Sequence, residues 1–508
     1  MKATKKIAAL LSVILVLTTF LSVGAFADTT PPAVWDGTAD TTWFDPSSKT
    51  KTVTLFTAEQ LAGLSELSKD EANLYFMNWT IKLGADIVLN TGDASTWGTT
   101  APANAWTPVT QFWGTFDGQG YTISGMYINN GDKEDVGFIS VVDGGTVKNV
   151  SFVNSYVVGG NRVGAVVGKI TNLNAEISNV YSDAYVTADG TSKNGEVVGG
   201  LIGDIVATGT VVKSCWFDGE VLAFDNQVWN KGTRVGGIAG RCYAAATLTD
   251  CLVTGSVKGQ NQCGGIVGAI DDNDTENCVL ENCLMLGTVE AYRSNSTYVI
   301  YVGEFAGIAF SRCGSFMLKN CYGVEGFSAT LTHHEDKANA ANTVTLNGSS
   351  TFDTNGTVTA ANATDHRFAE AELKGDGAAA KLVGFDFTNV WKTVEDSTPV
   401  IAALAHEAEN KTSGQNPLDP DEEAAKDNPV TPDSGNNDNT NDNTNDNTND
   451  NTDNNTNDNT NTTTDNTPAT TEAPAEEKKG CGSTIAGSAL VGLLVIGSAV
   501  VLGKKKED

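Results

Sequence analysis

Acidic and histidine side chains gather at three places where the sequence could support catalysis or metal binding. Residues 271–274 (DDND) form the densest acidic cluster among the central repeats, residues 333–336 (HHED) combine imidazoles with carboxylates, and Asp117 stands in a Phe-Asp-Gly turn. A glycosidase needs two carboxylates at a fixed separation, and a zinc site needs three or four ligands. The first cluster lacks the alternation of a calcium loop, the second has no further ligand at suitable spacing, and Asp117 is expected to cap its turn. We therefore predict no catalytic residue and no metal ligand.

Aromatic side chains in the spacers between β-rich blocks could contact a ligand. Trp229, Tyr292 and Tyr298 stand in such spacers, and aromatic rings of this kind pack against sugars or proteins through an apolar face and a polar edge. We name these three as weak ligand-binding candidates. The alternative, which the sequence leaves open, is packing against the wall of the domain. The same choice holds for the three tryptophans between residues 97 and 113.

Paired β-rich blocks predict the framework that would hold these side chains. The first blocks are VGFISV at 136–141, VGAVVG at 163–168, VGGLIG at 198–203, VGGIAG at 235–240, CGGIVG at 263–268 and VGEFAG at 302–307. The second blocks are VKNVSF at 147–152, ISNVYS at 177–182, VKSCWF at 212–217, LTDCLV at 248–253, LENCLM at 280–285 and LKNCYG at 318–323. Successive first blocks start 27 to 39 residues apart. Fixed blocks with variable spacers predict an all-β, right-handed parallel β-helix whose loops leave one edge of each coil.

Four cysteines support this prediction. Cys215, Cys251, Cys283 and Cys321 occupy the position of the second block where earlier copies have valine, and Cys263 replaces the opening valine of a first block. A position that exchanges Val with Cys is apolar and faces inward, so we expect a ladder of buried free thiols. Disulfides between coils stay open as the alternative, because strands about 4.8 Å apart fall within the allowed Cα range.

Residues 28–110 are expected to cap the solenoid and to supply its first strands. Thr57 and Gln60 form a capping box that begins a short helix. The strand IKLGADIVL at 81–89 follows. A helix over the open end of a β-helix protects the exposed strand edge from pairing with another chain.

The order of these motifs resembles the GLUG-repeat surface proteins of bacteria. TAEQLAGLSEL, LGADIVLN, FWGTFDGQGYTISGM and the repeated VGGIAG blocks carry the resemblance over residues 51–323, and FDFTNVWKTVEDSTPVIAAL at 385–404 carries it more weakly. The resemblance implies a β-helical extracellular module that acts in adhesion, as a scaffold without catalytic residues. The chain departs from the pattern because it lacks an LPxTG sorting motif. Cys481, in Gly-Cys-Gly, is a candidate anchor-processing residue instead.

The two ends of the chain predict export and membrane anchoring. Three lysines, an apolar run and Ala-Phe-Ala make residues 1–27 a signal peptide, cleaved between Ala27 and Asp28. Residues 481–508 contain an uncharged run followed by three lysines, which predicts a transmembrane helix with a cytoplasmic basic tail. We therefore expect an extracellular protein that the C-terminus anchors in the plasma membrane of a Gram-positive bacterium.

A low-complexity stretch joins the predicted anchor to the folded part. Residues 436–467 are almost wholly Asn, Asp and Thr and have no apolar side chains to bury, so we predict a disordered tether over residues 407–480. Residues 111–330 are assigned to the repeats and residues 331–406 to a closing segment. The formal charge of -30 argues against nucleic acid as a partner.

The sequence favours a non-catalytic surface module that binds a glycan or a host or bacterial surface protein. Two alternatives stay open: a β-helix lyase or glycosidase acting on polysaccharides, because fold alone does not decide activity, and a purely structural surface protein. No cofactor is predicted, and a structural calcium ion is the open alternative.

Overall fold

The computed structural model describes residues 32–189, 196–223, 233–260, 262–271, 277–293, 300–309, 315–325, 330–333, 344–347 and 367–413. All of them belong to one compact unit, Met1–Thr431. The predicted signal peptide, the cleavage site at Ala27 and Asp28, most of the tether, the anchor and Cys481 lie outside the described residues. Within the described part of the chain, no helix has the length and apolar character needed to cross a membrane.

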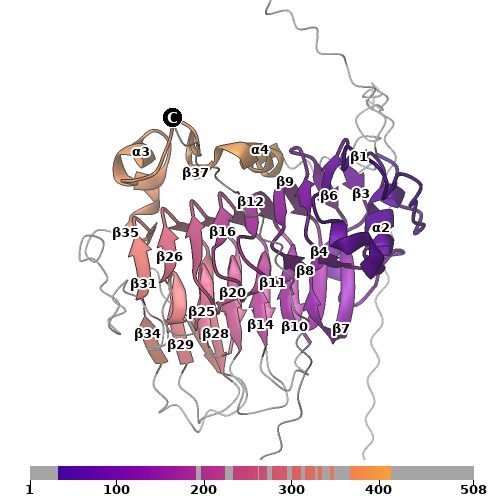
Figure 1. The fold of residues 1–508 in the computed structure, drawn as a ribbon. Helices are drawn as coiled ribbons and strands as arrows, with labels where there is room; N and C mark the ends of the chain where they lie inside the picture. Colours follow the sequence, from indigo (N-terminus) through magenta and orange to yellow (C-terminus); the bar gives the residue numbers. More distant parts are fainter. Residues whose placement is uncertain are drawn as a thin grey trace, which may run out of the picture. The chain divides into compact units, whose positions relative to one another are not determined.

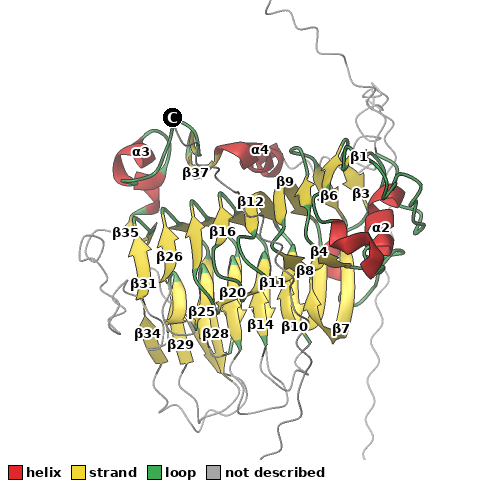
Figure 2. Ribbon diagram, in the orientation of Figure 1, coloured by secondary structure: helices red, strands yellow, loops and turns green. Residues whose placement is uncertain are grey.

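Parallel strands wind into a β-solenoid of three sheets, which confirms the predicted parallel β-helix (Figures 1 and 2). Among the described residues, sheet A has sixteen strands, sheet B seven and sheet C twelve. Sheet B receives one strand from each coil, so the described solenoid has about seven coils. Each coil runs through sheet B, then sheet A, then sheet C, as β11, β12 and β13 do.

The strands of sheet A are mostly short half-strands: β1 Thr52–Leu55, β2 Thr80–Leu83, β3 Ile87–Val88, β5 Thr115–Asp117, β6 Thr122–Ser124, β9 Thr146–Val153, β12 Glu176–Ser182, β16 Thr210–Lys213, β17 Trp216–Phe217, β21 Ala246–Thr249, β22 Leu252–Val253, β26 Asn277–Glu281, β27 Leu284–Met285, β31 Ser315–Lys319, β32 Tyr322–Val324 and β35 Arg367–Phe368. The strands of sheet B are β4 Val109–Phe112, β8 Ile139–Asp143, β11 Val167–Thr171, β15 Ile202–Ile205, β20 Ala239–Cys242, β25 Val267–Ile270 and β30 Ala306–Ala309.

The strands of sheet C come in pairs from most coils: β7 Tyr127–Val136, β10 Tyr156–Gly164, β13 Tyr185–Ala188, β14 Val197–Gly199, β18 Glu220–Ala223, β19 Arg234–Gly236, β23 Ser256–Gly259, β24 Gln262–Gly264, β28 Thr288–Arg293, β29 Ile300–Gly303, β33 Thr330–His333 and β34 Val344–Asn347. Strand β10 passes through the whole sheet, whereas later coils break between β13 and β14, β18 and β19, and so on. The variable spacers of the sequence thus enter at the same point of successive coils.

The first blocks are corners, at which the chain passes from sheet C to sheet B. In VGGLIG, β14 ends at Gly199 in sheet C and β15 begins at Ile202 in sheet B. The coils approach so closely here that a Cβ on Gly237 would lie 2.3 Å from the Gly265 carbonyl oxygen and 2.8 Å from a methyl group of Val253. Glycine is required because neighbouring backbones meet at the corner.

The interior is filled by Val, Ile, Leu, Phe and Cys side chains from all three sheets. Cys215, Cys251, Cys283 and Cys321 are at most 1% exposed, and each thiol contacts a backbone carbonyl of the preceding coil. Their thiols are free, as predicted, and Cys263 is buried between Val235 and Val302 in register. Burial raises the pKa of Cys215 to about 12, as expected for an unreactive core thiol.

A bend divides sheet A in each coil. The residue at the bend has a left-handed backbone conformation, with φ between 49° and 54°, and is Asn149, Asn179, Ser214, Asp250, Asn282 or Asn320. We call these six residues the bend row. Asn and Asp tolerate this conformation better than other non-glycine residues, because their short polar side chains hydrogen-bond locally.

The predicted capping helix is present as α2, Ala58–Leu67, beside the first coils (Figure 2). The Thr57 hydroxyl accepts a hydrogen bond from the Gln60 amide, as expected, but the Gln60 side chain accepts from the Phe56 amide. The segment 81–89 is not one strand: β2 ends at Leu83 and β3 begins at Ile87. A corner intervenes, so this part of the sequence prediction is wrong.

The segment after the last coil lies along the side of the solenoid. It contains η5 Glu370–Leu373, α3 Gly377–Lys381, the antiparallel hairpin β36 Trp391–Val394 and β37 Ser397–Ile401, η6 Ala402–Leu404 and α4 Ala405–Ser413. We call residues 369–413 the strap (orange in Figure 1). Solenoid strands continue to β35, and the strap ends with α4 at Ser413.

Candidate functional site

The strap covers a row of outward-facing side chains on sheet A. In register along successive coils these are Ser151, Tyr181, Trp216, Leu252, Leu284 and Tyr322, which we call the covered row. All of them except Ser151 form a hydrophobic cluster with strap residues that include Leu373, Leu382, Trp391, Val400 and Leu404. The strap runs from Tyr322 in a late coil back to Ser151 in an early one, against the order in which the coils occur in the chain.

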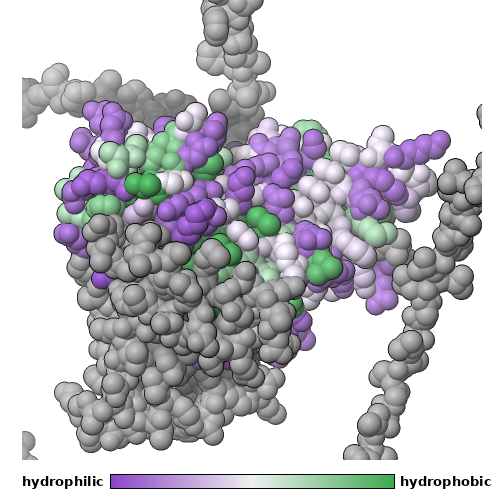
Figure 3. Space-filling model, turned by 60° about the vertical axis from the view of Figure 1, so that its left-hand side comes forward, coloured by the Kyte–Doolittle hydropathy of each residue, from purple (hydrophilic) through white to green (hydrophobic). Residues whose placement is uncertain are grey.

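Trp391 holds the middle of the strap on the solenoid. Its side chain is 1% exposed, and its Nε1 donates a hydrogen bond of 3.1 Å to Oδ1 of Asp250, a bend-row residue. Near the late coils, the Tyr322 hydroxyl donates to the Val383 carbonyl at 3.1 Å. Figure 3 shows one face of the molecule. On the described part of that face, hydrophobic residues form only small groups among hydrophilic ones.

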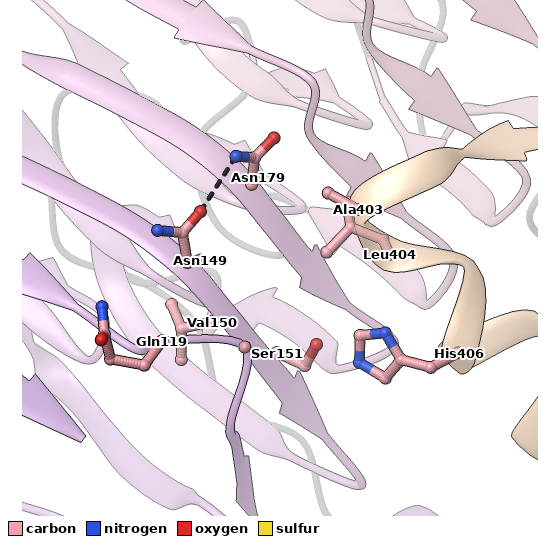
Figure 4. Close-up of a pocket in the computed structure, with 9 residues that line it drawn as sticks. Gln119, Asn149, Val150, Ser151, Asn179, Ala403, Leu404 and His406 are labelled. Carbon is pink, nitrogen blue, oxygen red and sulfur yellow. Dashed lines mark hydrogen bonds between the residues drawn. The ribbon is translucent and has the colours of Figure 1, made fainter. Parts of the chain in front are cut away.

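A pocket of about 260 Å³ opens where the last part of the strap meets the early coils (Figure 4). The solenoid contributes polar side chains from the bend row and its neighbours, and the strap contributes η6 and the start of α4. The lining residues are Gln119, Gly120, Asn149, Val150, Ser151, Asn179, Ala403, Leu404 and His406.

Hydrogen bonds between coils orient the carboxamides of the pocket. Asn179 Nδ2 donates to Asn149 Oδ1 at 2.9 Å, and Asn149 Nδ2 donates to Asp117 Oδ1 at 2.9 Å. Asp117 also accepts from the Gln119 amide, which confirms its predicted turn-capping role. Burial alone would raise the pKa of Asp117, but the hydrogen bonds from Asn149 and Gln119, together with the charge of Lys148, lower it. The hydrogen-bonded row Asn179–Asn149–Asp117 therefore ends on an ionised carboxylate. Because this carboxylate only accepts hydrogen bonds, each amide must point its NH2 group toward it.

His406 stands at the strap side of the pocket within a small ionisable cluster. Its Nε2 lies 3.0 Å from Oε1 of Glu407, whose side chain is 5% exposed. The neighbouring Glu407 carboxylate raises the pKa of His406 against the opposing effect of burial, and the charge of Asp86 adds to the increase. Burial raises the pKa of Asp86, whose carboxylate accepts a hydrogen bond from the Thr122 amide. The cluster thus sets one imidazole against two carboxyl groups.

The described residues that line this pocket do not include the ligand-binding candidates named from the sequence. Trp229 and Tyr298 lie outside the described residues, and Tyr292 is described only through its backbone, which pairs with Thr332 in sheet C. Most of the acidic cluster at 271–274 and of the HHED segment at 333–336 also lies outside them. The described residues contain no group of three or more His, Cys, Asp or Glu side chains arranged to hold a metal ion.

Aromatic rings of the early coils pack against the protein. Trp97 is 4% exposed and meets Tyr127 edge to face, with 6.0 Å between ring centroids. Trp106 is 2% exposed and stacks on Phe138 at 5.3 Å. Packing therefore explains these two tryptophans, whereas Trp113 is 39% exposed.

A stacked ladder of tyrosines on sheet C was not predicted. Tyr127, Tyr156 and Tyr185 are in register on successive coils, with centroid separations of 5.8 and 5.1 Å. The rings cover each other's faces, so they do not offer a flat platform to a sugar.

Two buried carboxylates on the solenoid are paired with arginines. Asp204 Oδ2 is 2.6 Å from Arg241 Nη2, and Glu304 Oε2 is 2.9 Å from Arg367 Nη2. Carboxylate oxygens that are engaged by a guanidinium suit a structural role better than that of a general acid.

Comparison with known proteins gives partial similarities. No family model matches the chain. A stretch of 201 residues, 39% of this chain, is 27% identical to Halomucin of Haloquadratum walsbyi and covers 2% of that protein. The chain thus spans a small fraction of the length of this relative. The structure is similar to the crystal structure of a candidate immunoglobulin A1 protease from Bacteroides ovatus, with a TM-score of 0.47 and 19% identity over 70% of this chain and 94% of that one.

Proposed function

We propose that this chain is a non-catalytic surface protein of the GLUG-repeat type, exported and anchored in the plasma membrane by its C-terminus, whose β-helix binds a glycan or a surface protein. The observation that carries the proposal is the pocket between the strap and the bend row, which gathers carboxamide, hydroxyl and imidazole groups. These groups both donate and accept hydrogen bonds, as recognition of a polar ligand requires.

The geometry of the pocket favours binding over catalysis. Ser151 and His406 both line it, but Ser151 is 2% exposed, and the imidazole is engaged by Glu407. A glycosidase would use two carboxyl groups facing one bond, whereas the pocket is lined by carboxamides. The solenoid also suits display, because a rigid rod with a regular surface can repeat weak contacts when many copies share one cell.

Binding of the purified full chain to an array of glycans and to intact host or bacterial cells tests the proposal. We expect binding that saturates and leaves the glycan unchanged. Release of reducing ends or unsaturated products from a polysaccharide would replace it with the lyase or glycosidase alternative. Absence of binding to every surface would favour a purely structural role.

The topology of the proposal has its own test. N-terminal sequencing of the mature protein should begin at Asp28, and protease added to intact cells should remove the β-helix. An intact Met1, or a β-helix that protease does not reach, would contradict export.

A further inference from the structure

The size of the pocket limits the part of a ligand that enters it. A volume of about 260 Å³ equals roughly nine water molecules at about 30 Å³ each. This is room for about one sugar ring with its substituents, and further rings of a glycan would extend outside the pocket. A glycan would therefore enter by a terminal residue, with the remainder of the chain outside.

The polar lining matches an amide substituent as well as hydroxyl groups. In the Asn149–Asn179 pair, each amide nitrogen uses one hydrogen in the row and carries a second one. Asn179 also has a carbonyl oxygen that points away from Asn149 (Figure 4). A carboxamide can pair with another amide through N–H and C=O on two separate atoms, whereas a hydroxyl group donates and accepts through one oxygen.

The apolar lining adds a place for a methyl group. Ala403 and Leu404 of the strap lie beside the carboxamides, with Ala403 exposed and Leu404 3% exposed. A polar sugar ring alone would leave these side chains against hydroxyl groups. An acetamido group supplies a methyl group for the apolar side and an amide for the polar side.

The charge of the pocket argues against an ionic ligand. His406 is held beside Glu407 and near Asp86, so its positive charge is already matched by carboxylates. A carboxylate on the ligand would have to compete with Glu407 for the imidazolium and would be repelled by both acids.

We propose that the pocket binds the terminal N-acetylhexosamine of a neutral glycan, with the acetamido group between the Asn149–Asn179 pair and the apolar side chains of the strap. This inference rests on the proposed function and names its ligand class.

Titration of the full chain with methyl glycosides, followed by saturation-transfer NMR, tests the ligand class. We expect the N-acetylglucosaminide or N-acetylgalactosaminide to bind at least about tenfold more tightly than the glucoside, which corresponds to about 1.4 kcal/mol. Equal binding of the glucoside, tighter binding of a uronic acid, or no binding of the N-acetyl sugars would overturn the inference. If the array nevertheless shows binding to other glycans or proteins, the proposed function stands without it.

Two matched pairs of variants test the position of the site. Ala402 and Ala403 are both exposed neighbours in η6, but only Ala403 lines the pocket. Ala403→Leu should therefore weaken N-acetyl sugar binding at least about tenfold, and Ala402→Leu should change it less than about twofold. Binding that survives Ala403→Leu would place the sugar elsewhere and overturn the inference.

The second pair compares equivalent amides inside and outside the pocket. Asn179 and Asn320 share a left-handed backbone and each donates Nδ2 to the asparagine of the preceding coil, at 2.9 and 3.1 Å. Asn→Gly retains the backbone conformation at both positions. Asn179→Gly should lose sugar binding while Asn320→Gly retains it, with equal melting temperatures as the folding control. Equal loss in both variants would indicate a structural effect and would contradict the site.

Discussion

The side chains of the bend row offset the cost of the left-handed backbone conformation at the bend. A left-handed conformation at a residue with a side chain costs roughly 1–2 kcal/mol, and a hydrogen bond returns about 1 kcal/mol. Asn149 and Asn179 reduce the first cost because of their residue type and gain the second through hydrogen bonds between coils. The same side chains become the polar wall of the pocket, so a residue chosen for folding is also placed for recognition.

At the same scale, docking of α4 is expected to depend on pH. The Glu407 carboxylate beside it raises the pKa of His406 above its ordinary value of 6.5, with help from Asp86 and Glu409. A raised histidine pKa stabilises the folded state fully below the unfolded-state value and ceases to do so as the pH rises through the folded-state value. The raised pKa of Asp86 acts in the same direction, from its ordinary value of 3.8 upward. Tyr181, which also faces Glu407, titrates far above this range because burial raises its pKa.

Urea unfolding between about pH 6 and about pH 9 checks this dependence. The midpoint should fall with rising pH in the wild-type protein and fall less in His406→Gln, which retains a hydrogen-bonding side chain without a titrating proton. Identical pH profiles for the two proteins would show that His406 does not contribute.

The residue types of the bend row are visible in the sequence, but the pocket that they line is not. The third position of each second block is Asn, Ser or Asp, in VKNVSF, ISNVYS, VKSCWF, LTDCLV, LENCLM and LKNCYG. Those residue types favour turns and left-handed backbone, so the bend could have been predicted. The pocket could not, because His406 and Asn149 meet only when the strap folds back over coils far away in the sequence.

At the scale of elements, the fourth and fifth positions of the second block lie on opposite faces of sheet A. The fourth position faces inward and exchanges Val with Cys, as the sequence predicted. The fifth position faces outward but holds Tyr, Trp or Leu in most coils, in Tyr181, Trp216, Leu252, Leu284 and Tyr322. An apolar residue on the outer face of a sheet signals that something covers it. The sequence thus indicated a cover without indicating that residues 369–413 supply it.

The corner glycines give a prediction for the elements they join. A Cβ on Gly237 would meet the Gly265 carbonyl oxygen at 2.3 Å, so Gly237→Ala must separate two coils. We expect a loss of roughly 1–3 kcal/mol in unfolding free energy, as for other overpacked sites. Gly377→Ala is the control, because its Cβ would have no neighbour closer than 3.5 Å and alanine favours helix. Equal melting temperatures for both variants would contradict the tight corner.

At the scale of the whole molecule, the strap makes the solenoid more than a stack of neighbouring coils. In a simple solenoid each repeat contacts only its neighbours. Here Trp391 bonds to Asp250, 141 residues away, and Leu404 lies beside Ser151. Such long-range contacts couple early and late coils, so we expect more cooperative unfolding than stacking alone would give.

Removal of the strap tests its part in covering the apolar row. A chain that ends after Phe368 should bind a hydrophobic dye and self-associate, because the covered row is then exposed. A chain that ends after Thr431 retains the strap and should behave like the full chain in both measurements. If the two truncated chains behaved alike, the strap would not be the cover that we describe.

The position of the strap also sets a time order for synthesis. It is translated after every coil of the described solenoid, yet it lies on coils that were made first. Until residue 391 has been added, Asp250 has no indole to bond, and the tyrosine and tryptophan rings of the covered row face water. A chain that terminates before the strap would thus expose the apolar side chains of the covered row, and proteases and chaperones recognise such exposed apolar surface. Docking of the strap removes this exposed apolar surface only after all the described coils have been synthesised.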